Sequence, residues 1–140
     1  PVLIAPVTDR ATGTFEVKLA PLPAHAGATD SLLGRMSIDK RFAGDLDATS
    51  VGEMLTALTA TSGSAGYVAI ERVSGTLHGR RGTFVLQHGG TMARGAQQLT
   101  VTIVPDSGTG ELTGIAGTML IVIDGKTHSY ELEYTLPAAG

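Results

Sequence analysis

The chain has no cysteine and no tryptophan among its 140 residues, and only 16% of its residues are charged. Without cysteine there can be no disulfide, no thiolate metal ligand and no cysteine nucleophile. An average domain carries about 25% charged residues, and glycine, threonine and alanine fill the difference here. A surface with so little charge is typical of a protein that covers part of itself with a second copy, so we expect a homo-oligomer.

Positively charged residues are also few: the chain has 10 Lys and Arg against 13 Asp and Glu, which gives a net charge of −3. No basic stripe runs along the chain, so nucleic acid is not expected as a partner. No apolar run reaches the ~18 residues that a membrane-spanning helix needs. The apolar segment 1–7 lacks the basic start of a signal peptide. We therefore expect a cytoplasmic protein that binds neither nucleic acid nor membrane.

Short segments of alternating apolar and polar residues recur between glycine-rich turns, a pattern typical of a β-sandwich or β-barrel. In residues 14–19, for example, Phe15, Val17 and Leu19 share one face. Residues 49–55 fit either a bent strand or a short helix, and we favour the strand. The prediction is an all-β fold, a single closed antiparallel β-barrel of about eight strands. One domain spans 1–140, with 1–11 as an N-terminal extension.

The central hairpin is predicted from residues 66–77 and 82–89. A type II′ turn at Gly79-Arg80 would join them and place Glu71 opposite His88, both on the apolar inward face. The same register places Gly75 opposite Phe84. An error of two residues would keep these faces, whereas an error of one would exchange them.

The last hairpin is predicted around Asp124-Gly125, a strong type I′ turn signal. This register places Met119 opposite Tyr130 and Gly117 opposite Leu132, with Tyr134 on the same inward face. A further inward row is expected between the two hairpins, made of Leu99, Val101 and Ile103.

Residues 75–88, with the sequence GTLHGRRGTFVLQH, resemble the signature of the DUF3224 family of small bacterial proteins. Segments 44–46, 52–55, 67–71 and 107–112 strengthen the resemblance, which covers about residues 12–136. The resemblance implies a barrel like that of allene oxide cyclase. It implies no catalytic residues, because no activity is established for the family. Barrels of this type also host cyclases, but an analogy of fold says little about function.

The inward polar residues form the candidate site. Glu71 and His88 are the candidate catalytic pair, since an apolar cavity raises the pKa of a carboxyl group and a nearby imidazole can relay its proton. In the structural alternative, the same two groups only hydrogen-bond each other and close the barrel interior. His128 lies nearer the rim. The candidate ligand-binding residues are Tyr67, Phe84, Leu86, Tyr130 and Tyr134.

Other chemistry finds little support in the sequence. Glu53 is expected to be solvated, and His25 and His78 to lie in surface loops. No histidine and acidic residues have the spacing of a zinc site, so no metal is expected, and no cofactor-binding motif occurs. No serine sits in a nucleophile elbow. A proline such as Pro1 serves as the base of tautomerases, but the β-α-β unit of those enzymes does not follow it here.

The sequence thus leaves three functions open. The first is a barrel that encloses a small apolar organic molecule and acts as a cofactor-independent cyclase or isomerase. The second is a carrier or sensor that binds such a molecule without chemistry. The third is a packed structural barrel that acts through its oligomer interface.

Overall fold

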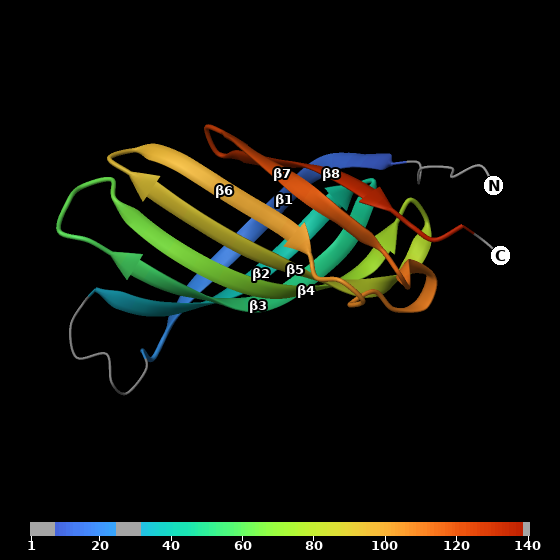
Figure 1. The fold of residues 1–140 in the computed structure, drawn as a ribbon, viewed down its shortest axis with the longest axis horizontal. Helices are drawn as coiled ribbons and strands as arrows, with labels where there is room; N and C mark the ends of the chain where they lie inside the picture. Colours follow the sequence, from blue (N-terminus) through green and yellow to red (C-terminus); the bar gives the residue numbers. More distant parts are fainter. Residues whose placement is uncertain (1–7, 25–31, 139–140) are drawn as a thin grey trace, which may run out of the picture.

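The computed structural model describes residues 8–24 and 32–138. Eight antiparallel strands, each paired with its neighbours in sequence, form a barrel that closes where β1 pairs with β8 (Figure 1). The predicted fold class is therefore confirmed, and residues 49–55 lie in a strand. The strands are β1 (Asp9–Leu22), β2 (Leu33–Gly44), β3 (Leu46–Leu58), β4 (Ala65–Leu77), β5 (Arg80–Ala93), β6 (Ala96–Ile103), β7 (Ala116–Asp124) and β8 (Thr127–Thr135).

One end of the barrel is closed by a packed apolar core. The connection from β6 to β7 crosses this end, at the right of Figure 1, and contains a short 3-10 helix, η1 (Gly110–Leu112). Leu112 and Ile115 from this connection are buried against the strands. The Thr109 amide donates a hydrogen bond of 2.9 Å to the Thr83 carbonyl oxygen, which fixes the connection to β5. The core also contains Phe42, Leu46, Leu77, Phe84, Leu86, Ile103, Leu132 and Tyr134.

The opposite end of the barrel is open. Side chains alternate between the two faces of a strand. Along each strand, residues an even number of positions away from a buried core residue therefore also face inward. Toward this end the inward residues lose their burial: Leu19 is 45% exposed and Leu99 is 43% exposed. We call this open end the mouth and define it by its inward side chains. They include Val17, Leu19, Met36, Met54, Tyr67, Met92, Leu99, Ile121, Ile123 and His128.

Both predicted hairpin registers were wrong by two residues, and both kept the predicted faces. In the central hairpin the turn is His78-Gly79, where both residues have positive φ (46° and 78°), as a type I′ turn requires. Glu71 is therefore paired with Leu86 instead of His88. The type II′ prediction failed because it did not allow the non-glycine residue His78 to adopt a left-handed conformation.

In the last hairpin, Gly125 and Lys126 form the turn, and Asp124 pairs with Thr127. Met119 accordingly faces Leu132, and Ile121 faces Tyr130. The inward row between the hairpins is confirmed for Val101 and Ile103, which are buried. Leu99 shares their face, but it lies beyond the core, at the mouth.

The β6–β7 seam is the weakest part of the wall, because the ladder between these strands shows the single pair Thr102–Thr118 in the described residues. At the N-terminus, strand β1 begins within the expected extension 1–11, since Asp9 already pairs with Tyr134. Residues 1–7 lie outside the described residues. No helix in the described part of the chain has the length and apolar character needed to cross a membrane.

Candidate functional site

The polar centre of the barrel lies between the packed core and the mouth. Glu71 on β4 is completely buried and has three polar neighbours. Lys40 Nζ donates a hydrogen bond of 2.9 Å to Glu71 Oε2, and Ser50 Oγ donates one of 2.8 Å to Oε1. His88 Nε2 lies 2.7 Å from Oε2, although its N–H is not well directed at this oxygen. Glu71 and His88 therefore meet inside the barrel, as predicted, but as two members of a group of four.

The electrostatics of this group differ from the prediction. Burial alone would raise the pKa of the Glu71 carboxyl group, because a low-dielectric interior disfavours its charged form. The contact with His88 and the positive charge of Lys40 outweigh burial and lower this pKa to about 2. At neutral pH Glu71 is therefore a carboxylate with occupied lone pairs and cannot serve as a proton donor.

Sequence reasoning missed Lys40 and Ser50. Lys40 lies on β2 between Ile38 and Phe42, in phase with inward apolar residues, so its side chain enters the barrel. Its ammonium group also lies 5.0 Å from the centre of the Phe15 ring, a distance at which a cation is attracted to an aromatic face. A lysine in the apolar phase of an alternating strand was the signal that could have identified this residue.

Two of the predicted ligand-binding tyrosines are occupied by structural contacts. The Tyr130 hydroxyl accepts a hydrogen bond of 2.9 Å from the Leu46 amide and donates one of 2.9 Å to the Ala43 carbonyl oxygen. It thereby fixes the connection between β2 and β3. The Tyr134 hydroxyl lies 2.5 Å from Nδ1 of His78 in the β4–β5 turn. Burial is the main cause of the raised pKa of both hydroxyls.

The other predicted ligand-binding residues lie at different depths. Phe84 and Leu86 are fully buried in the core, where they contact other core side chains. Tyr67, in contrast, lies at the mouth, half-buried on the inner face of β4. Its ring covers Gly90 on β5 so closely that a Cβ atom there would lie 2.5 Å from the ring. Of the predicted set, Tyr67 is the residue that a molecule entering the mouth would meet.

Methionine is concentrated on the inner face of the barrel. All four methionines of the chain face inward, and Met36, Met54 and Met92 lie at the mouth. Met36 and Met54 are direct partners across β2 and β3. Methionine side chains are flexible and polarizable, and they are common on surfaces that bind apolar molecules of varied shape. Neither the type nor the position of these residues was used in the sequence analysis.

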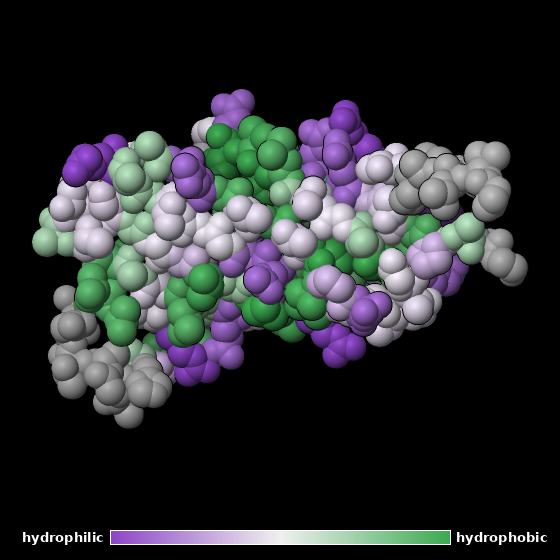
Figure 2. All heavy atoms as spheres, viewed as in Figure 1, coloured by the Kyte–Doolittle hydropathy of each residue, from purple (hydrophilic) through white to green (hydrophobic). Residues whose placement is uncertain are grey.

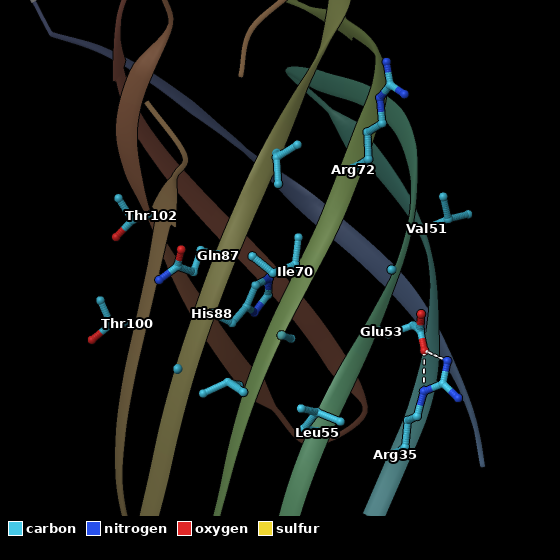
Figure 3. A pocket seen from close by; sticks show the side chains of 15 residues that line it. Arg35, Val51, Glu53, Leu55, Ile70, Arg72, Gln87, His88, Thr100 and Thr102 are labelled. Atoms are coloured by element: carbon cyan, nitrogen blue, oxygen red, sulfur yellow. Dashed lines mark hydrogen bonds and ion pairs between the residues drawn. The ribbon is translucent and has the colours of Figure 1, made fainter. Parts of the chain in front are cut away.

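A groove of about 910 Å³ runs over the outside of the wall across β3, β4, β5 and β6 (Figure 3). Exposed apolar side chains of β3 and β4 line it, and hydrophobic surface is visible over these strands in Figure 2. At one side of the groove Glu53 is exposed and paired with Arg35, whose Nε donates a hydrogen bond of 2.6 Å to Oε1. Glu53 is thus solvated, as the sequence indicated, and lies outside the barrel interior.

The remaining histidines and acidic residues form no second candidate site in the described residues. His78 lies in the β4–β5 turn, partly exposed, and also approaches Asp45 at 3.6 Å. His25 lies outside the described residues. In residues 8–24 and 32–138, no three His, Cys, Asp or Glu side chains gather closely enough to hold a metal ion.

Comparisons with known proteins agree with this architecture. The family described as "Protein of unknown function (DUF3224)" matches residues 11–134. A crystal structure of a DUF3224 protein of unknown function from Shewanella oneidensis MR-1 is 52% identical, with a TM-score of 0.88. This similarity covers 94% of the present chain and 100% of the other. The comparison with curated proteins gave no match.

Proposed function

The chain belongs to the DUF3224 family, and we propose that it binds a small apolar organic molecule in the mouth of its barrel. The observation that carries the proposal is the exposure of inward-facing apolar side chains at one end of a barrel whose other end is packed. Leu19, Leu99 and the half-buried methionines contribute apolar surface that faces the barrel axis and still meets solvent. Covering this surface with an apolar molecule releases about 25 cal/mol per Å² buried.

Binding without chemistry, as a carrier or sensor, fits this geometry better than a cyclase or isomerase. A general acid must hold a proton near neutral pH, and the lowered pKa of Glu71 prevents this. The carboxylate oxygens are also occupied by Lys40, Ser50 and His88. Glu71 is therefore not free to act with His88 as the predicted acid–base pair.

The proposal can be tested with the apolar dye N-phenyl-1-naphthylamine, whose fluorescence increases in apolar surroundings. The wild-type protein should enhance its emission in a saturable way. Met54→Glu places a carboxylate in the mouth and should weaken dye binding at least tenfold. The matched control is Ile70→Glu, which places the same charge on the outer face of the neighbouring strand and should leave binding unchanged.

The two variants also identify the alternative site. If Ile70→Glu abolishes dye binding and Met54→Glu does not, the dye occupies the outer groove and the proposal is wrong. A wild-type protein that does not enhance the emission at all would contradict the proposal equally.

A second function, association with another copy of the chain, is favoured by the outer groove. Val51, Leu55, Val68 and Ile70 are each more than half exposed and adjacent on β3 and β4. Both signs of charge border this patch, Glu53 from β3 and Arg72 from β4. We propose a two-fold dimer in which Glu53 of one copy faces Arg72 of the other, since a two-fold interface must be complementary to itself.

The oligomeric state tests this second proposal. Light scattering should give the mass of a dimer for the wild-type protein and of a monomer for Ile70→Glu. Leu120→Glu, on the outer face of β7, is the matched control and should remain a dimer. A monomeric wild-type protein would contradict the proposal.

A further inference from the structure

Building on the proposed binding at the mouth, we propose that the bound molecule is an uncharged amphiphile. Its polar end carries a hydrogen-bond acceptor, such as a carbonyl oxygen, and this acceptor is bound by the hydroxyl group of Tyr67. The apolar body lies against the methionine side chains of β2 and β3.

The position of Tyr67 supplies the first argument. The other two tyrosines of the chain have hydroxyl groups engaged with the backbone or with His78. The Tyr67 hydroxyl has no hydrogen-bond partner within residues 8–24 and 32–138, and its ring is held against the inner wall over Gly90. A donor that is half-buried, fixed in place and free to bond is the feature that orients a polar atom in an otherwise apolar site.

The protonation state of Tyr67 supports the same role. Burial and the negative charge of Glu71 raise the pKa of its hydroxyl above the ordinary value of 10.0. The hydroxyl therefore keeps its proton at physiological pH and donates a hydrogen bond. A ligand group that accepts a hydrogen bond fits this donor.

The charge balance of the site indicates an uncharged ligand. On the inner face between core and mouth, the lysine, arginine and acidic side chains of the described strands are Lys40 and Glu71 alone. These two neutralise each other at 2.9 Å, and Lys40 also lies against Phe15. The two inward histidines are already engaged, His88 with Glu71 and His128 in a stack against the Phe15 ring. A carboxylate or an ammonium group entering the mouth would therefore lose its water without gaining a lysine, arginine or acidic counter-ion, which is unfavourable. A carbonyl group carries no such cost.

Displacement of the dye by three molecules of equal chain length tests the inference. Octan-2-one, octanoate and octylammonium present a carbonyl, an anion and a cation on the same apolar chain. Octan-2-one should displace the dye at a concentration at least tenfold below that of either charged molecule. In Tyr67→Phe this advantage should shrink about fivefold, while the affinity for the dye, which carries no carbonyl acceptor, stays the same.

The outcomes separate this inference from the function on which it rests. Stronger displacement by octanoate or octylammonium, or an octan-2-one affinity that Tyr67→Phe leaves unchanged, would overturn the inference while dye binding still supports the mouth as a site. A failure of the wild-type protein to bind the dye would overturn the proposed function and this inference with it. A thermal melt of Tyr67→Phe that matches the wild type is the control for folding.

Discussion

Lys40 on β2 and Glu71 on β4 form an ion pair that spans the intervening strand β3 inside the barrel, with 2.9 Å between Nζ and Oε2. Glu71 is 0% exposed and Lys40 is 9% exposed. A buried pair of this kind stabilises little compared with apolar residues of similar volume, yet the loss of one partner leaves a buried charge uncompensated. The effect on stability of substituting Lys40 therefore depends on whether Glu71 is present, and the reverse.

A double-mutant cycle should reveal this dependence. Lys40→Met and Glu71→Leu should each destabilise the protein by about 3–5 kcal/mol, because each leaves an unpaired charge in the interior. The double variant should cost much less than the sum of the two single changes. Urea unfolding of the four proteins measures the coupling, and additive costs would show that the pair does not exist in solution.

Acid should destabilise the protein through the same carboxylate. The pKa of Glu71 is about 2 in the folded protein and near 4.5 when the chain is unfolded, so the unfolded state takes up the proton first. The stabilisation is complete above about pH 4.5 and is lost as the pH falls toward 2. Melting temperatures measured across this range should fall more steeply for the wild-type protein than for Glu71→Gln. Parallel slopes would contradict the lowered pKa.

Removal of a single hydroxyl should distinguish a structural tyrosine from a ligand-binding one. Tyr130→Phe leaves the Leu46 amide and the Ala43 carbonyl oxygen without their partner and should destabilise by about 1–3 kcal/mol. Tyr67→Phe removes a hydroxyl without a protein partner and should change stability by less than about 0.5 kcal/mol. Denaturant unfolding of both variants checks the order, and equal costs would contradict it.

The assignment of faces predicts a contrast between core and surface. Leu86→Ala and Leu132→Ala each remove a completely buried side chain and should destabilise by about 2–5 kcal/mol. Glu133→Ala and Lys18→Ala alter exposed residues of the outer face and should stay within about 0.5 kcal/mol. Chemical denaturation is sufficient for the comparison, and the reverse order would mean that inner and outer faces are exchanged.

The faces of the strands could be predicted from the sequence, whereas their registers could not. Alternation of apolar and polar residues determines which side chains face inward, and it is unchanged by a shift of two residues. The choice between neighbouring turns depends on local backbone conformation. His78 adopts a positive φ, which is uncommon for non-glycine residues, and the partner of Glu71 is therefore Leu86 instead of the predicted His88.

The candidate site was predicted in part. Glu71 and His88 lie together because both belong to the inward phase of neighbouring strands. Lys40 enters the group from β2, and its contact with Glu71 crosses β3, so no pattern within one hairpin could reveal it. The roles of the tyrosines depend on partners far along the chain, as with Tyr130 and the Leu46 amide, and single-strand periodicity carries no information about such contacts.

The pairing of β6 with β7 has a consequence for the size of the molecule that can enter. Seven of the strand pairs around the barrel are extended ladders, whereas this one is held by Thr102 and Thr118. Leu99 and Met119 from the inner face already border a hollow of about 440 Å³ along this seam. Because β6 and β7 share so few backbone hydrogen bonds, the barrel wall can open between these two strands while the packed core at the other end stays intact. If the mouth binds apolar molecules as proposed, parting of β6 from β7 would let it take up molecules of different size.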